Sequence, residues 1–531
     1  MREVRCGERR SNLTQGVIIR LLHYVRNDDF IYRHYITATV KHLQSTMQNT
    51  VRFVLDDRIV EVDFSKFPEL KPTTTVLNYL RSFPAHKGVK EGCAEGDCGA
   101  CTVVIAEPEG NNKLVYKTLD SCLVFLPMIH GKQLITVENL AISEKNEKIL
   151  HPVQQLMVDT NGTQCGYCTP GIVMSLFGIY KNHRNPSREI IEDALTGNLC
   201  RCTGYQPIIE AARRACANKG KDHFSGKEKD TLAMLKEITG NKKTLEVKTG
   251  KQKFLKPFTL KEALRLRKEY PDAILVNGAT DVALRQTKKK ELFACIIDIS
   301  GVDELKSFKE DKGNFIFGAG LSMEQLKKYS ADNLPALYKI LKVFGSLQIR
   351  NIATIGGNVG SASPIGDTIP VLFAYGAKIK LRSGTSTRTV NIEKFIKGYR
   401  KTDIKNDELI TEVIIPKYKN DTLIESYKVS KRKNLDISTV SGAFKLNLDK
   451  EKVSEIILAF GGMAATTKRA EKTEKFLNGK KWSRENVEAA MDILAKEFTP
   501  LSDARSEAEY RRVAAKNLLM KFYLETEKVH K

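Results

Sequence analysis

The chain lacks several features that define large classes of protein. No apolar run in its 531 residues approaches the roughly 18 that a membrane-spanning helix requires. It also lacks a basic helix or a stripe of basic and aromatic residues, although its formal net charge is +23. The lysines are spread along the chain with acids between them. We therefore expect no membrane span and no nucleic-acid binding, and we interpret the charge as a solvated surface that attracts an acidic partner or cofactor.

We expect no secretory signal in the N-terminal stretch, because its apolar run VIIRLL is short and interrupted by arginine. Residues 1–46 have no clean period, and we expect a disordered extension or an overcalled start. Glu3, Glu8, Asp28 and Asp29 argue against an organelle leader. A cytoplasmic location is the expectation, and there thiols stay reduced and clustered cysteines bind metal.

Cysteine, in contrast, is present in an informative pattern. The chain has 11 cysteines, and an odd total argues against a closed disulfide framework. Eight of them fall into two groups of four. The other three have no partner in spacing and are expected to be ordinary thiols: Cys6, Cys216 and Cys295.

The first group places three thiols in the loop CAEGDCGAC and a fourth further along: Cys93, Cys98, Cys101 and Cys122. This is the spacing of a plant-type 2Fe-2S cluster. The backbone must approach the cluster sulfurs closely, which suits the glycines at positions 92, 96 and 99. A structural zinc site is the alternative, although zinc loops usually come as paired C-x2-C knuckles.

The second group joins QCGYC to LCRC and consists of Cys165, Cys168, Cys200 and Cys202. Taken alone, this set suits either zinc or a 2Fe-2S cluster. Beside a ferredoxin-like cluster in the same chain, a second one-electron carrier is the more economical interpretation.

The order of periodic segments predicts an α+β multidomain protein. GIVMSLFGIY is apolar on every side and predicts a buried helix, Ser187 is a predicted N-cap, and residues 484–498 form an amphipathic pattern. The predicted parts are an extension over 1–46, a small mixed sheet around the first cysteine loop over 51–132, a helical bundle over 133–216, a Lys-, Gly- and Thr-rich linker over 217–255, an α+β region over 256–420, and a further α+β module over 421–531.

Three stretches, GCAEGDCGACTV, QCGYCTPGIVMS and GNLCRCTGYQPI, resemble the iron–sulfur signatures of the molybdenum hydroxylases, and within them of the xanthine dehydrogenases. The resemblance implies a ferredoxin-like β-grasp domain and a helical 2Fe-2S domain. It places the first cysteine group nearer the flavin and the second nearer a molybdopterin. Asp97 departs from the family, which often has glycine there. Its charge is expected to shift the local potential, but the change removes no cluster ligand. Gln164 occupies a position that resembles one from which family members contact molybdopterin. The alternative role for Gln164 is local capping of the cluster loop.

Two glycine-bearing stretches follow, LVNGATDVAL at 275–284 and TIGGNVGSASPIGD at 354–367. Neither is a Rossmann fingerprint, and on the residues alone ordinary tight turns are favoured over a diphosphate site. Both resemble segments of the flavin domain of the same family, which has a vanillyl-alcohol-oxidase-type fold. The resemblance implies FAD contacts from Leu275, Val276, Asn277, Gly278, Ala279, Thr280, Asp281, Val282, Phe344, Thr354, Ile355, Gly356, Gly357, Asn358, Ser361, Asp367, Ile410 and Lys428.

Two of these contacts have simpler interpretations: core packing for Phe344 and a solvated charge for Lys428. The stretch RKNLDIS departs from the family, whose dehydrogenases tend to have an acidic pair before the isoleucine. Here Leu435 replaces the first acid and only Asp436 remains, so NAD is less firmly implied than FAD.

The resemblance implies an electron-transfer subunit of a xanthine dehydrogenase, acting in purine catabolism. Electrons from a molybdopterin-binding large subunit would pass through two 2Fe-2S clusters to FAD and then to NAD, within a heterotetramer. One alternative is the equivalent subunit for an aldehyde, nicotinate or another heterocycle. The other is a stand-alone iron–sulfur flavoprotein.

Overall fold

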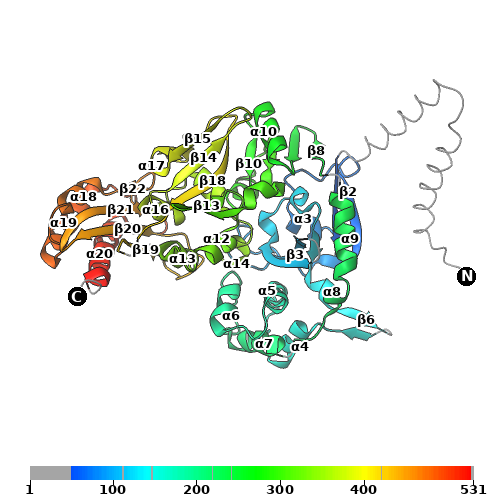
Figure 1. Cartoon of the computed structure of the whole chain (residues 1–531). Coiled ribbons are helices and arrows are strands. Elements are labelled where there is room, and N and C mark those ends of the chain that lie inside the picture. The colour runs from blue at the N-terminus through cyan, green and yellow to red at the C-terminus, as the bar shows by residue number, and fades with distance from the viewer. Residues whose placement is uncertain are drawn as a thin grey trace, which may run out of the picture. The chain divides into compact units, whose positions relative to one another are not determined.

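The computed structural model describes residues 49–110, 113–144, 147–217, 219–240, 242–419 and 421–527. The predicted extension over 1–46, which includes Cys6, lies outside these residues. The chain divides into a short unit over 1–50 and a large unit over 51–531. Apart from Thr50 at the start of the first strand, every element below belongs to the large unit (Figure 1). No helix among the described residues is long and apolar enough to cross a membrane.

A five-stranded sheet has the order β2-β1-β5-β3-β4, and the first cysteine loop leads directly into its strand β3. Asp56 and Asp57 both adopt the left-handed backbone that a two-residue hairpin turn requires (φ 52° and 59°). β5 pairs in parallel with β1, so the sheet extends to Ile135, beyond the predicted boundary at 132. Its elements are β1 (Thr50–Leu55), β2 (Arg58–Asp63), α3 (Val76–Arg81), η1 (Pro84–His86), β3 (Thr102–Glu109), β4 (Lys113–Asp120), η2 (Ser121–Leu123), η3 (Leu126–Ile129) and β5 (Gln133–Ile135).

Helices carry the second cysteine group. α5 (Thr169–Asn182) is buried at every residue from Gly171 to Tyr180, as expected of a helix that is apolar on all sides. α6 (Arg188–Leu195) begins after Ser187, whose hydroxyl accepts from the Ile190 N–H and confirms the predicted N-cap. The neighbouring elements are η4 (Val137–Leu140), β6 (Ile142–Glu144), β7 (Glu147–Ile149), α4 (Pro152–Asp159) and α7 (Gln206–Ala217).

The predicted linker over 217–255 is wrong, because the described residues of this segment fold into helices and strands. It forms α8 (His223–Gly226), α9 (Glu228–Thr239), β8 (Leu245–Thr249) and most of β9 (Gln252–Lys256). α9 buries Leu232, Leu235 and Ile238 against the same core as α5. The many Lys, Gly and Thr residues between these positions conceal an apolar stripe of helical spacing, which is why composition alone indicated a linker.

Two sheets make up the next region. The first has the order β10-β11-β9-β8, and the second has the order β12-β13-β18-β14-β15. The region of the first sheet contains α10 (Leu260–Glu269), β10 (Ile274–Val276), α11 (Val282–Thr287), β11 (Cys295–Asp298), η5 (Ile299–Gly301) and η6 (Asp303–Lys306). The second region contains β12 (Phe308–Glu310), β13 (Asn314–Gly318), α12 (Met323–Ser330), α13 (Pro335–Leu341), α14 (Leu347–Arg350), α15 (Ile355–Ser361), α16 (Thr368–Ala374), β14 (Lys378–Arg382), β15 (Thr387–Asn391), α17 (Ile392–Phe395), β16 (Ile396–Gly398), β17 (Lys401–Thr402) and β18 (Leu409–Pro416).

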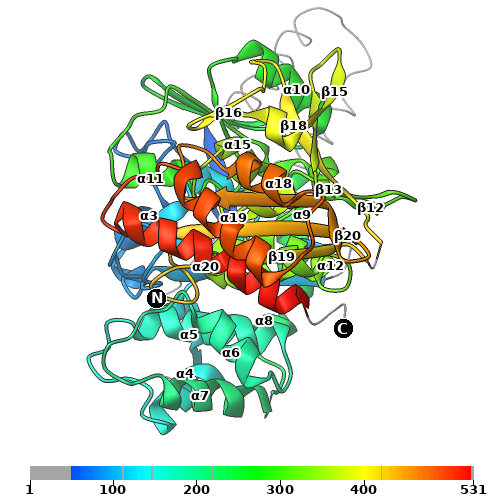
Figure 2. The same cartoon turned by 90° about the vertical axis from the view of Figure 1, so that its left-hand side faces the viewer.

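The C-terminal part is a four-stranded sheet in the order β19-β20-β21-β22, and helices cover it. Figure 2 shows α19 and α20 lying across its strands. The predicted helix over 484–498 is present as α19 (Arg484–Glu497), with Val487, Ala490 and Leu494 buried. The remaining elements are β19 (Leu423–Val429), β20 (Val440–Asp449), β21 (Lys452–Gly461), β22 (Lys468–Arg469), α18 (Glu471–Leu477) and α20 (Ala508–Thr526). The whole architecture confirms the predicted α+β multidomain class.

Candidate functional site

The first cysteine loop curls tightly around one sulfur. Gly96 and Gly99 have positive φ (77° and 67°), which glycine adopts at no steric cost. The curl turns the N–H groups of Glu95 and Asp97 toward Cys93 Sγ, at 3.4 and 3.3 Å. Backbone N–H groups aimed at a cysteine sulfur are the donors that tune an iron–sulfur cluster.

The four thiols of this loop form two pairs, Cys93 with Cys98 and Cys101 with Cys122. A 2Fe-2S cluster needs two thiolates for each of its two irons, whereas zinc takes four ligands around one ion. Contact with the Cys98 thiol, opposed by burial and aided by the Glu95 N–H, lowers the pKa of Cys93 to about 5. A lowered pKa favours the thiolate, which is the form of cysteine that binds iron.

The second group has the same pairwise arrangement, Cys165 with Cys202 and Cys168 with Cys200. Cys168 caps the N-terminus of α5, and Cys200 and Cys202 lie in the turn between α6 and α7. Cys165 and Cys202 are exposed. Within the described ranges, no three His, Cys, Asp or Glu side chains lie close enough together to hold one metal ion. The pairing of the thiols suits a cluster in which each of two irons takes two thiolates, and the second group lies at the surface.

The two cysteine groups touch through the backbone. The N–H of Leu199, which precedes Cys200, donates to the carbonyl of Cys98 at 3.0 Å. Asn198 Nδ2 donates to the carbonyl of Gly99 at 3.1 Å. A short path of covalent and hydrogen bonds therefore connects a thiol of one group to a thiol of the other.

The two predicted flavin loops lie side by side. Thr354 Oγ1 donates to the carbonyl of Asn277 at 3.2 Å and accepts from the Gly357 N–H at 3.1 Å. Gly278 has φ 90°, and a Cβ there would lie 1.8 Å from the carbonyl oxygen of Ile352. No side chain separates the loops at this point. Glycine is therefore required at position 278 for the two loops to pack this closely.

Asp367 gathers the contacts predicted for the other end of the flavin. Its buried carboxylate pairs with Lys428 Nζ at 2.8 Å and accepts from Ser438 Oγ at 2.5 Å. Lys428 Nζ also donates to the carbonyl of Val343, the residue before Phe344. The Lys428 side chain is only 4% exposed, so it is not a solvated charge. Phe344 packs partly buried against the core of the second sheet.

Residues of α15 connect these two ends. Asn358 Oδ1 accepts from Thr368 Oγ1 at 2.6 Å, beside Asp367. Ile410 Cδ1 lies 3.4 Å from where a Cβ of Gly360 would stand. The predicted contacts therefore form one continuous strip from the 277–282 loop to Lys428. Asp281 is the member that is engaged elsewhere, in a bidentate pair with Arg400.

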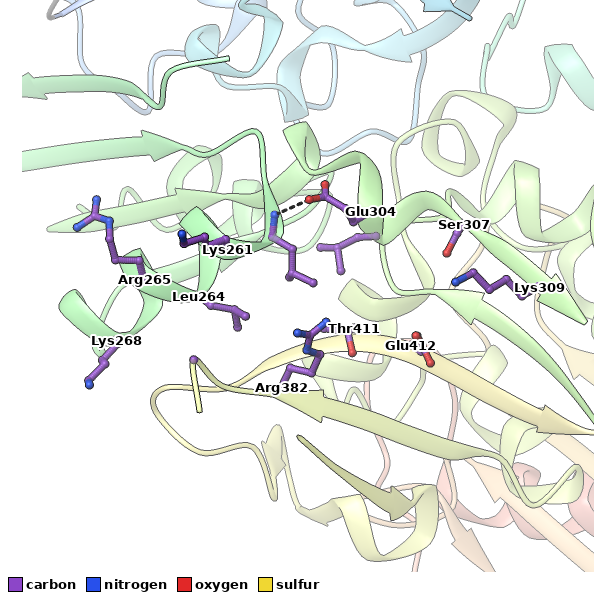
Figure 3. Close-up of a pocket in the computed structure, with 13 residues that line it drawn as sticks. Lys261, Leu264, Arg265, Lys268, Glu304, Ser307, Lys309, Arg382, Thr411 and Glu412 are labelled. Atoms are coloured by element: carbon purple, nitrogen blue, oxygen red, sulfur yellow. Dashed lines mark hydrogen bonds between the residues drawn. The ribbon is translucent and has the colours of Figure 1, made fainter. Parts of the chain in front are cut away.

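A separate cavity of about 600 Å³ lies beside α10, β14 and β18 (Figure 3). None of the predicted flavin contacts lines it, although Thr411 on its wall follows Ile410. Most of its charged side chains are basic: Lys261, Arg265, Lys268, Lys309 and Arg382, against Glu304 and Glu412. The cavity is therefore not the site that the sequence predicts.

The sequence did not reveal the cations that hold the first cysteine loop. Lys288 Nζ donates to the carbonyl of Cys93 at 2.6 Å and pairs with Glu95 at 3.2 Å. Arg432 pairs with Asp97 at 3.0 Å. Both cations stand in Lys-rich stretches that indicate a solvated surface, so no local signal distinguishes them from their neighbours.

Three family models match parts of this chain. One described as a "[2Fe-2S] binding domain" matches residues 136–213, and one described as "FAD binding domain in molybdopterin dehydrogenase" matches residues 247–418. A third, "CO dehydrogenase flavoprotein C-terminal domain", matches residues 425–526. The helical cysteine region and the flavin strip thus lie in segments that match cofactor-binding families.

Whole-chain relatives agree with these models. The chain is 32% identical to a Xanthine dehydrogenase/oxidase of Gallus gallus, over 90% of this chain and 40% of that protein. It is 32% identical to a Xanthine dehydrogenase of Emericella nidulans, over 92% of this chain and 39% of that protein. It therefore spans about two fifths of the length of these relatives. Reconstituted CO dehydrogenase from Oligotropha carboxidovorans shares the fold, with a TM-score of 0.50, 22% identity, and coverage of 53% of this chain and 99% of that one.

The chain belongs to the molybdenum hydroxylase family, of which it carries the iron–sulfur and FAD portion. The relatives from Gallus gallus and Emericella nidulans carry the names Xanthine dehydrogenase/oxidase and Xanthine dehydrogenase.

Proposed function

We propose that this chain is the electron-transfer part of a xanthine dehydrogenase, working with a molybdopterin-bearing partner subunit. The observation that carries the proposal is a series of hydrogen bonds that joins the second cysteine group to the first, and the first to the flavin region. Leu199 N–H bonds to the Cys98 carbonyl, and Lys288 from the flavin region bonds to the Cys93 carbonyl. The first group therefore lies between the exposed second group and the flavin strip.

The residues take distinct roles in this scheme. One cluster would be held by Cys93, Cys98, Cys101 and Cys122, and the other by Cys165, Cys168, Cys200 and Cys202. The loops at 275–282 and 354–361 would hold the FAD diphosphate, and Asp367, Lys428, Phe344 and Ile410 would surround the ring. When bound, the clusters carry single electrons, and FAD collects two and delivers them as hydride.

Cys165 and Cys202 are exposed, so a cluster bound by the second group would lie at the surface, where a partner subunit can approach it. Gln164, which precedes them, is also exposed and is proposed as a partner contact. We propose NAD as the final acceptor and a heterotetramer as the assembly, with purine hydroxylation on the partner. An equivalent role for another substrate is a second candidate, favoured by the match of residues 425–526 to a CO dehydrogenase flavoprotein domain.

The test is to purify the chain with whatever co-elutes and to quantify iron, sulfide, flavin and molybdenum. We expect about four irons and about one FAD per chain, with molybdenum only in the co-eluting subunit. Cys98→Ser should lower the iron content by about half and interrupt reduction of the flavin. The matched control is Cys295→Ser, outside both groups, which should retain all iron. Zinc in place of iron, or full iron in Cys98→Ser, would reject the proposal.

A further inference from the structure

Residues 430–437 form a loop whose two ends are anchored on the flavin strip. Lys428, just before the loop, pairs with Asp367 at 2.8 Å. Ser438, just after it, donates to the other carboxylate oxygen of Asp367 at 2.5 Å. Asp367 therefore contacts a residue near each end of the loop, whose stem is closed by the pairing of Val429 with Val440.

The far part of this loop reaches the first cysteine loop through Arg432. Its Nη2 donates to Asp97 Oδ1 at 3.0 Å, and its Nε donates to Asp436 Oδ1 at 2.5 Å. A planar guanidinium can engage two carboxylates in this way, whereas an ammonium group cannot hold both in a fixed geometry. Arg432 thus joins a residue that stands directly before Cys98 to the loop anchored at Asp367.

The loop is internally braced so that Arg432 is already in place. The Arg432 N–H donates to Asp436 Oδ2 at 2.8 Å, and Ser430 Oγ donates to the Arg432 carbonyl at 2.6 Å. Leu435, which lies between Arg432 and Asp436, has φ 71°, a left-handed backbone that is unfavourable for a non-glycine residue. A pre-organised side chain loses less entropy on forming a contact than a free one does.

We infer that Arg432 is a positioning residue that couples the first cysteine loop to the flavin strip through Asp97. The inference rests on the proposed function and deepens it, because it names the contact that sets one step of the electron path. Lys288 supplies a second, independent attachment of the same cysteine loop at Glu95.

The size of the expected effect follows from exposure. The Arg432 and Asp97 side chains are 44% and 39% exposed, so the pair holds the loops together only modestly. Loss of either partner should speed amide hydrogen exchange in the opposite loop by about two- to fivefold, the range for an exposed ion pair.

The experiment is a double-mutant cycle of Asp97→Asn, Arg432→Gln and the double variant, followed by hydrogen exchange at residues 92–99 and 430–437. Asp97→Asn leaves the Arg432–Asp436 contact intact, so faster exchange in 430–437 reports the coupling alone. The double variant should be no worse than Arg432→Gln alone, because Asp97 has no guanidinium partner left to lose once Arg432 is replaced. Arg432→Lys should give partial rescue, since it keeps the charge but not the fork.

The matched control is Lys431→Gln, which removes an equal charge from the same loop and should leave residues 92–99 unchanged. Effects confined to the mutated loop, or additive effects in the double variant, would overturn the inference. The same cycle is then measured on the rate of flavin reduction by the clusters. Absence of iron and flavin would defeat the proposed function, while the exchange cycle would still decide whether the two loops are coupled.

Discussion

At the scale of single residues, Gly99 has a second constraint besides the curl of the cysteine loop. A Cβ at Gly99 would lie 2.1 Å from the carbonyl oxygen of Gly197, and a Cβ at Gly171 would lie 2.1 Å from the carbonyl oxygen of Gly99. Real side chains do not approach backbone atoms this closely. Gly99 and Gly171 therefore let the two cysteine regions pack backbone against backbone.

We predict that Gly99→Ala disrupts both cysteine groups. The left-handed backbone alone costs about 1–2 kcal/mol, and the overlap with Gly197 requires a displacement in addition. The control is Gly250→Ala, at φ 52° with no atom within 4 Å, which carries the conformational cost only. Iron content and the midpoint of thermal unfolding should fall much further in Gly99→Ala. Equal losses in the two variants would show that the close packing is not what matters.

At the scale of elements, the segment over 217–255 is stabilised by Asp222. Its carboxylate caps α8 by accepting from the Ser225 N–H at 2.8 Å, and it pairs with Lys181 at 2.9 Å and His151 at 3.4 Å. Burial acts against the charge, but the bonds from His151 and Ser225 and the charge of Lys181 hold the pKa of Asp222 well below its usual range. One buried carboxylate thus connects α8 to α4 and α5.

Asp222→Asn should be destabilising in a pH-dependent way. Removing one partner of a buried ion pair costs about 3–5 kcal/mol. Because the folded-state pKa lies below the unfolded value, this stabilisation is present above about pH 4 and is lost as the pH falls further. The thermal midpoints of the wild type and the variant should differ at neutral pH and converge in acid. Asp230→Asn, on the exposed face of α9, should differ little at either pH; a gap for Asp222→Asn that persists in acid would contradict the prediction.

At the scale of the large unit, the short helix α14 joins the parts that carry the cofactor sites. Gln348 Nε2 donates to Ser175 Oγ at 2.9 Å and to Asn198 Oδ1 at 2.8 Å, in the helical region. Asn351 Nδ2 donates to the carbonyl of Thr118, next to the first cysteine group, at 2.8 Å. Arg350, fully buried, pairs with Asp193 of α6 at 2.6 Å.

We predict that Arg350→Met weakens the attachment of the helical region. Arg350 also pairs with Glu324 at 2.7 Å. Without Arg350, Asp193 and Glu324 keep only Lys327 as a shared cation. The free energy of unfolding should fall by about 3–5 kcal/mol. Lys342→Met breaks an exposed pair with Glu189 on the same two regions and should cost roughly 0–1 kcal/mol. Limited proteolysis and thermal unfolding should separate the two variants, and equal sensitivity would contradict the role assigned to Arg350.

Much of the fold was readable from local patterns. The turn at Asp56 and Asp57, the cap at Ser187 and the buried helix α5 follow from turn chemistry, capping and apolar character within a few residues. The folded state of residues 217–255 was not readable in this way. The apolar stripe consists only of Leu232, Leu235 and Ile238 among many polar residues. Its contribution to stability depends on the core that distant elements provide.

The sequence alone determined the eight thiols, their division into two groups and the glycines that permit tight loops, because these depend on spacing along the chain and on backbone freedom. Only the tertiary structure decided which thiols pair, that Leu199 bonds to the Cys98 carbonyl, and that Arg432 reaches Asp97. Contacts between residues hundreds of positions apart depend on how separately formed elements pack, and no local pattern encodes which of many similar lysines and arginines will face a given carboxylate.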